Sequence, residues 1–162
     1  MRTLIAVVGG SAASSSVCRL AEEVGRLIAE RGAVLLCGGL GGVMEAAARG
    51  ARRAGGLTVG VLPGYDAAEA NPHIEVALCS GMGYARNVIL VASAEAVIAL
   101  EGLHGTLSEM AHALQLGKVV VALGRSHNPP GVRVARTPEE AVTLALSPPP
   151  SGEGRGGVEG VC

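Results

Sequence analysis

Short apolar runs alternate with amphipathic segments along most of this chain, and glycine stands at the junctions between them. Thr3 to Val8 is a continuous apolar run that Gly9-Gly10-Ser11 follows directly, and Ala33 to Cys37 and Leu57 to Leu62 are further runs of this kind. Such runs are typical of strands that are buried on both faces. Because strands that alternate with helices form parallel sheets, the pattern predicts an α/β fold with a doubly wound parallel sheet.

Helices are predicted between these strands from apolar spacing and capping signals. Apolar residues recur at helical spacing from Val17 to Ile28, and Ser14 to Ser16 offer N-caps in front of them. The other predicted helices span residues 43–54, 84–93, 105–116 and 137–146, and the other predicted strands span residues 73–78, 96–100, 119–123 and 132–135. Residues 147–162 are rich in Pro and Gly and predict a disordered tail. One domain of residues 1–146 is therefore expected.

Composition excludes several functional classes. The formal net charge is −1, and the chain has no Trp, no Phe and two Tyr, so neither a basic field nor aromatic platforms predict a nucleic-acid partner. No apolar run approaches the roughly 18 residues that span a bilayer, so no membrane partner is expected. Neither the four cysteines nor the histidines show metal-ligand spacing, and Cys37 and Cys79 are predicted to be buried free thiols. Free thiols predict a cytoplasmic location.

Three glycine-bearing loops, at residues 9–10, 38–42 and 102–105, follow predicted strands. The carboxyl ends of parallel strands share one edge of a sheet, where backbone N–H groups at a helix start bind phosphates. The candidate phosphate- or ligand-binding residues on this predicted rim are Gly9, Gly10, Ser11, Gly38, Gly39, Gly41, Gly42, Gly102, His104, Gly105 and Thr106. For the loop at 38–42, the alternative is a tight turn for close helix–strand packing, because it matches neither a dinucleotide fingerprint nor a P-loop.

The segment from Glu101 to Glu109 joins a predicted strand to a predicted helix and carries a carboxylate near this anion site. Two interpretations remain open. Thr106-x-x-Glu109 is either a capping box, which only satisfies N–H groups at a helix start, or part of a site in which Glu109 acts on a ligand. Arg86 lies in the first turn of the helix predicted at residues 84–93 and favours the second interpretation, because an arginine can hold a phosphate or stabilise charge.

The motif Gly102-x-x-Gly105-Thr106-x-x-Glu109, together with Arg86 and the loop at 38–42, resembles the Lonely Guy (LOG) superfamily, whose members are often labelled lysine decarboxylases. The family motif is Pro-Gly-Gly-x-Gly-Thr-x-x-Glu, preceded by a helix with a catalytic arginine. Glu101 and Leu103 stand where that motif has Pro and Gly. The resemblance covers nearly all of residues 1–146, and the run from Gly81 to Asn87 is similar to the branch that includes molybdenum-cofactor carriers.

The resemblance implies a three-layer, Rossmann-like fold and a homodimer or homotetramer. It implies that Arg86 and Glu109 are catalytic and that Asn87 joins the glycine loops in binding a phosphorylated ligand. In the family's enzymes a nucleoside 5′-monophosphate is cleaved to free base and ribose 5-phosphate, and no cofactor is required. A pyridoxal phosphate decarboxylase is rejected, because the only lysine, Lys118, is predicted at the edge opposite the glycine rim.

Three functions remain open on these residues. In a phosphoribohydrolase, Glu109 would stabilise an oxocarbenium-like state, and Arg86 would hold the phosphate or help the leaving base. In a carrier, the same rim would hold molybdenum cofactor without turning it over, which Glu101 and Leu103 favour. In a sensor, the rim would bind a nucleotide derivative. In each case the expected ligand is a phosphorylated small molecule, either a nucleotide or molybdenum cofactor.

Overall fold

The computed structural model describes residues 1–148 of the chain, which form seven strands, five α-helices and two short 3-10 helices. The strands are β1 (Leu4–Val8), β2 (Val34–Cys37), β3 (Thr58–Leu62), β4 (Val76–Cys79), β5 (Ala96–Ala99), β6 (Val119–Leu123) and β7 (Arg133–Ala135). The helices are α1 (Ser15–Glu30), α2 (Val43–Arg53), α3 (Arg86–Ser93), α4 (His104–Gln115) and α5 (Pro138–Leu146), with η1 (Ala67–Glu69) and η2 (Gly83–Ala85). The tail expected to be disordered lies outside the described residues, apart from Ser147 and Pro148.

All seven strands belong to one parallel sheet in the order β4-β3-β2-β1-β5-β6-β7. The chain moves outward from β1 to β4, then returns to the other side of β1 and continues from β5 to β7. The order of the strands therefore reverses between β1 and β5. In sheets of this kind, ligands bind beyond the carboxyl ends of the strands at such a reversal. This arrangement confirms the predicted doubly wound, Rossmann-like fold.

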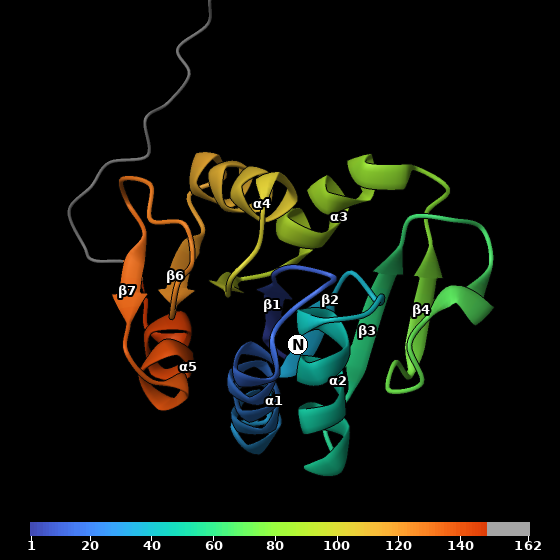
Figure 1. Cartoon of the computed structure of the whole chain (residues 1–162), viewed down its shortest axis with the longest axis horizontal. Helices are drawn as coiled ribbons and strands as arrows, with labels where there is room; N and C mark the ends of the chain where they lie inside the picture. The colour runs from blue at the N-terminus through green and yellow to red at the C-terminus, as the bar shows by residue number, and fades with distance from the viewer. Residues whose placement is uncertain (149–162) are drawn as a thin grey trace, which may run out of the picture.

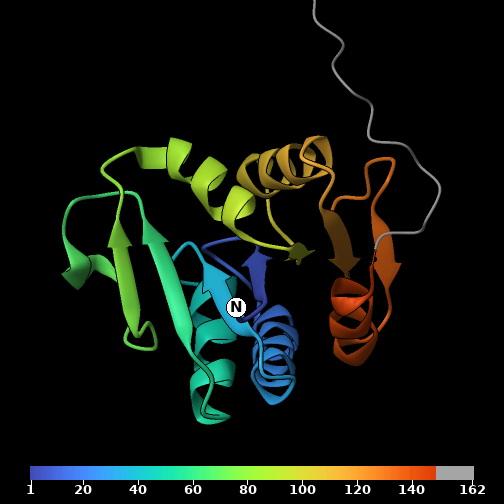
Figure 2. The same ribbon diagram turned by 180° about the vertical axis from the view of Figure 1, so that it is seen from behind.

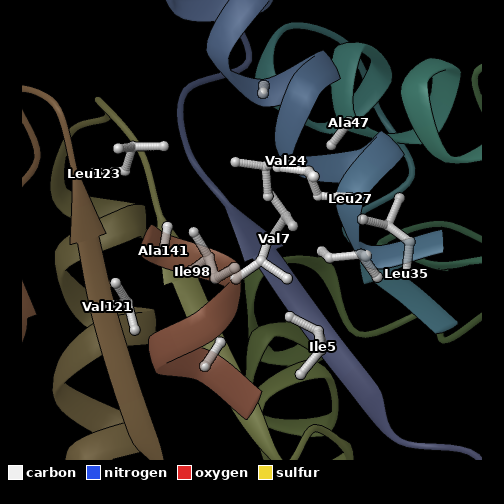
Figure 3. Close-up of a cluster of buried hydrophobic side chains, with 14 of the residues drawn as sticks. Ile5, Val7, Val24, Leu27, Leu35, Ala47, Ile98, Val121, Leu123 and Ala141 are labelled. Carbon is white, nitrogen blue, oxygen red and sulfur yellow. The ribbon is translucent and has the colours of Figure 1, made fainter. Parts of the chain in front are cut away.

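Helices cover both faces of the sheet, so the molecule has three layers. Figures 1 and 2 show α1, α2 and α5 on one face and α3 with α4 on the other. On the first face, side chains of the central strands such as Val7 and Ile98 converge with Val24 and Leu27 of α1 (Figure 3). A smaller cluster lies under α3 and α4 and includes Leu90. Across residues 1–148, no helix is both long and apolar enough to cross a membrane.

Helices α1 and α2 lie in unusually close contact because both carry glycine where they meet. A methyl group on Gly25 would overlap the Ala47 carbonyl, and one on Gly50 would overlap the Glu22 carbonyl. Such overlap is absent only because glycine has no Cβ, so the helix backbones themselves are in contact. Arg49 and Arg53 of α2 then both reach Glu22 of α1, at 3.0 and 2.5 Å. The α1–α2 pair is therefore joined at its centre by backbone contact and at its exposed side by ion pairs.

The sequence predictions fail at one edge of the sheet and at one helix start. The strand expected at residues 73–78 is β4, which begins only at Val76 and is an edge strand with three exposed side chains. Cys79, predicted to be buried, is exposed there because no further strand or helix within residues 1–148 covers it, whereas Cys37 on central β2 is buried as predicted. The capping-box interpretation of Thr106 is wrong. The N-cap of α4 is Leu103, and Thr106 is a buried residue inside the helix.

Candidate functional site

The loops that follow β1, β2 and β5 meet at the point where the strand order reverses. The Gly10 amide donates a hydrogen bond to the Glu101 carbonyl at 2.9 Å, which joins the loop after β1 to the loop after β5. The Val43 amide donates to the Gly10 carbonyl at 3.0 Å, which joins the same loop to the start of α2. The three glycine loops are therefore brought together into one rim, as the sequence predicted.

Three helices begin on this rim. α1 begins at Ser15 with Ser14 as its N-cap, α2 begins at Val43, and α4 begins at His104. The first N–H groups of a helix have no partner within the helix and carry its positive dipole end. The caps of α2 and α4 supply no side-chain hydrogen bond. The Val43 amide of α2 is already bonded to the Gly10 carbonyl, but the amides that follow it in α2 and the first amides of α4 have no side-chain cap and are open to an anion.

Close packing or a positive φ angle explains most glycines of the rim. A methyl group on Gly9 would overlap the Val43 side chain, one on Gly38 would lie 2.6 Å from the Met44 sulfur, and one on Gly102 would overlap Thr106. Gly39 and Gly42 have positive φ angles, of 76° and 65°, that favour glycine.

Gly41 and Gly105 have no such reason among the described residues. A methyl group on Gly41 would lie 3.6 Å from the nearest atom, the Ser11 carbonyl oxygen, and one on Gly105 would meet nothing within 4 Å. Neither residue has a positive φ. Both lie at helix starts on the rim, where a missing Cβ leaves the backbone open to an incoming group. These two glycines favour a ligand site over a tight turn, because close packing explains neither of them.

Arg86 lies beneath the rim rather than on it. Its side chain is 7% exposed, and its Nη1 donates hydrogen bonds to the Gly38 carbonyl, at 2.5 Å, and to the Val61 carbonyl. It therefore connects α3 to the ends of β2 and β3 and holds the loop at 38–42 from below. Burial lowers the pKa of Arg86, and the nearby Glu109 carboxylate partly offsets this effect. Its Nε has no hydrogen-bond partner among residues 1–148.

Glu109 lies in the second turn of α4, half-buried and close enough to Arg86 for the guanidinium charge to act on it. Burial raises the pKa of Glu109 to about 7, and the Arg86 guanidinium opposes this rise. Burial also raises the pKa of the nearby Cys37 thiol to about 11. A carboxyl group with a pKa near neutrality can exchange a proton under physiological conditions. The structure thus brings together Arg86 and Glu109, the two residues that the resemblance implied to be catalytic.

A cavity of about 300 Å³ opens between α3 and α4 beside this pair. It is lined by Tyr84, Ala85, Asn87, Val88, Ser108, Glu109 and His112. Asn87, a predicted ligand-binding residue, therefore lies in the cavity with Glu109 and not on the glycine loops. Ser11 and His104 are exposed, whereas Thr106 is 3% exposed and lies against Gly102.

A larger hollow, of about 580 Å³, lies over α1 and α2 away from these residues. Its charged side chains include Glu22, Glu23, Arg26 and Arg53, which form ion pairs with one another or with neighbours on the same two helices. Paired surface charges of this kind need no ligand, so the hollow is explained by the α1–α2 contact. No group of three or more His, Cys, Asp or Glu side chains within residues 1–148 is arranged to hold a metal ion.

Sequence reasoning missed three residues that hold the rim loops. Asn71 donates from its side chain to the carbonyls of Gly39 and Leu40, at 3.2 and 2.9 Å. Ser126 donates to the Leu100 carbonyl at 3.2 Å, and the ring Nε2 of His127 lies 2.9 Å from the Gly102 carbonyl oxygen. All three come from loops far away in the chain, so no local spacing in the sequence could have identified them.

Comparison with known proteins gives relatives that this chain matches over nearly their full length. An uncharacterized protein from the archaeon Archaeoglobus fulgidus is 46% identical over 143 residues, which cover 88% of this chain and 94% of that protein. The molybdenum cofactor binding protein of the phototrophic bacterium Rippkaea orientalis is 37% identical, with a TM-score of 0.84 over 89% of this chain and 95% of that one. The molybdenum cofactor carrier protein of Chlamydomonas reinhardtii is 35% identical, with a TM-score of 0.79 over 88% and 95%.

These structures confirm the fold, which the two cofactor-binding proteins share over nearly their full length. The model of the SLOG cluster4 family matches residues 2–148, which is nearly all of the described part of the chain. The chain therefore belongs to the SLOG cluster4 family.

Proposed function

We propose that this protein binds a phosphorylated pterin ligand of the molybdenum-cofactor type at the glycine rim and holds it without turning it over. The observation that carries the proposal is the pair of open glycines, Gly41 and Gly105, at two helix starts on one rim. Glycine costs about 1 kcal/mol relative to alanine inside a helix, so Gly105 in the first turn of α4 destabilises the ligand-free protein slightly. A phosphate that approaches the backbone at these two positions would explain why both residues are glycine.

Similarity to two proteins that bind or carry molybdenum cofactor supports the same ligand class. The buried position of Arg86 also supports binding over catalysis, because its Nη1 is already engaged by two backbone carbonyls. In this proposal Arg86 positions the loop at 38–42, and the phosphate is held by backbone N–H groups of the rim. The finer placement of the chain within the Lonely Guy superfamily is part of this proposal.

The test compares Gly105→Ala and Gly41→Ala with wild-type protein, each produced in cells that make molybdenum cofactor. Molybdenum per chain is measured by elemental analysis after purification, and pterin is measured by fluorescence. We expect both variants to fold normally, because a methyl group has space at each position, and to lose most of the bound cofactor. Gln115→Ala, exposed at the far end of α4, is the matched control and should retain it. Cofactor retained in both glycine variants, or absent from wild-type protein, would contradict the proposal.

Hydrolysis of nucleoside 5′-monophosphates is a second candidate, favoured by one observation. The pKa of Glu109 is raised to about 7 beside Arg86, which suits a group that exchanges protons near neutral pH. Incubation of the protein with AMP, followed by chromatography of released adenine, tests this function. Wild-type protein must release base at least tenfold faster than Glu109→Gln, since otherwise Glu109 plays no chemical role.

We further propose that the protein is a homo-oligomer in the cytoplasm, assembled through β4 and the exposed face of α3. β4 is an unpaired edge that exposes Val76 and Leu78, and α3 exposes Ile89. Unpaired edges and exposed apolar side chains mark association surfaces. Light scattering after gel filtration should give a dimer or tetramer for wild-type protein and a smaller species for Ile89→Asp. A monomeric wild-type protein would refute this assembly.

A further inference from the structure

An unpartnered side-chain oxygen on α3 and a carboxylate on α4 line the same cavity. The side-chain oxygen Oδ1 of Asn87 is buried and has no hydrogen-bond partner among residues 1–148. The Glu109 carboxylate likewise receives no hydrogen bond from the described part of the chain, and its surroundings act on it only through burial and the charge of Arg86. A buried acceptor that has lost its water and gained no donor destabilises the fold. Residues 1–148 therefore leave one buried acceptor, Asn87 Oδ1, without a donor, and a half-buried carboxylate lines the same cavity.

Both acceptors line the same cavity of about 300 Å³. That volume lies at the lower end of the roughly 300–1,000 Å³ of small-molecule pockets, which suits a single heterocycle better than a whole nucleotide. Tyr84 and Val88 add apolar surface to the lining. The cavity adjoins the rim, because Glu109 and the rim residue Gly105 lie one helical turn apart on α4. A ligand with its phosphate at the rim can thus reach the cavity with its base.

We propose that the α3–α4 cavity binds the edge of a heterocycle that carries two adjacent N–H donors, the amino-oxo edge shared by guanines (2-amino-6-oxo) and pterins (2-amino-4-oxo). One donor is accepted by Asn87 Oδ1 and the other by the Glu109 carboxylate. This inference rests on the proposed function and names the class of heterocycle that the site selects. Other classes match less well. The Glu109 carboxylate would repel a phosphate, and the Arg86 guanidinium would repel a cationic group. The Watson–Crick edge of adenine offers one donor beside an acceptor, so it cannot supply both hydrogen bonds.

The test measures the affinities of wild-type protein for GMP, IMP, AMP and ribose 5-phosphate by calorimetry at pH 8. IMP is GMP without the 2-amino group, so the affinity ratio of GMP to IMP isolates one donor. We expect GMP to bind at least about tenfold more tightly than IMP, because a site built around a donor rejects the analogue that lacks it. The ratio should fall towards one in Glu109→Leu or in Asn87→Ser, whichever variant removes the acceptor of the 2-amino group. Gln115→Ala, outside the cavity, should keep the wild-type ratio.

Each outcome decides between the two proposals. Equal binding of GMP and IMP by wild-type protein, or a preference that persists in both variants, overturns this inference. Binding of ribose 5-phosphate without any preference among the bases overturns this inference alone and leaves the phosphate rim intact. If none of the four probes binds, the phosphate rim and the heterocycle site fall together. A variant that fails to fold decides nothing against the inference, because the ratio in wild-type protein and in the other variant still tests it.

Discussion

Replacement of Glu109 by glutamine should stabilise the protein at neutral pH, by an amount that depends on pH. Burial raises the pKa of Glu109 from 4.5 to about 7 in the folded protein. Between these values the folded chain keeps a proton that the unfolded chain has released, so the free energy of unfolding falls as the pH rises. At 1.36 kcal/mol per pKa unit, the penalty amounts to about 3 kcal/mol above pH 7. Glutamine has the same shape and no such penalty.

The difference between Glu109→Gln and wild-type protein should therefore be small at pH 4.5, grow through pH 5–7, and level off at about 3 kcal/mol by pH 8. Arg86 on α3 acts on this carboxyl through its charge, Cys37 on β2 lies close enough to be affected by it, and Tyr84 and His112 line the same cavity. Urea unfolding followed by far-ultraviolet circular dichroism is the suitable assay, because the chain has no Trp for a fluorescence signal.

Glu101→Gln is the matched control, because Glu101 is exposed in the loop just before α4. It should change the free energy of unfolding by less than about 0.5 kcal/mol at every pH. The reasoning is refuted if Glu109→Gln is less stable than wild-type protein at pH 8. It is also refuted if the difference between the two proteins is the same at pH 5 and pH 8.

Three further predictions concern stability and accessibility. Gly25→Ala should lower the free energy of unfolding by about 2–3 kcal/mol in the urea titration, because its methyl group overlaps the Ala47 carbonyl. In the same titration, Gly105→Ala should leave the free energy of unfolding unchanged or raise it by up to about 1 kcal/mol. Arg86→Met should lower the free energy of unfolding by about 2 kcal/mol or more, because two backbone carbonyl groups lose their donor. Calorimetric melting that shows no loss of stability would contradict the buried hydrogen bonds. A thiol reagent should label Cys79 in the native protein and spare Cys37 until the chain is unfolded, as peptide mass spectrometry would show.

The elements of the sheet could be predicted because their signals are local. Apolar runs gave six of the seven strands close to their observed positions, and Thr137 with Pro138 marked the start of α5 by a side-chain cap that the structure contains. The start of α4 was predicted less well. Thr106-x-x-Glu109 matches a capping box in spacing, but the helix begins at His104, so Thr106 turns into the protein against Gly102. A capping motif depends on where the chain enters the helix, and the entry here is set by the contact between Gly10 and Glu101.

By itself, the sequence determined that β1, β2 and β5 end in glycine loops and that these loops share one rim, because a parallel sheet places the carboxyl ends of its strands together. Only the tertiary structure decided which glycines are crowded and which are open, because the atoms that fill the space come from other elements. It also decided that Arg86 lies under the rim and that Asn87 and Glu109 share a cavity. Burial depends on what α3 and α4 place around a side chain. Burial shifts the pKa of Glu109, and it leaves Asn87 Oδ1 without a hydrogen-bond partner in the described part of the chain.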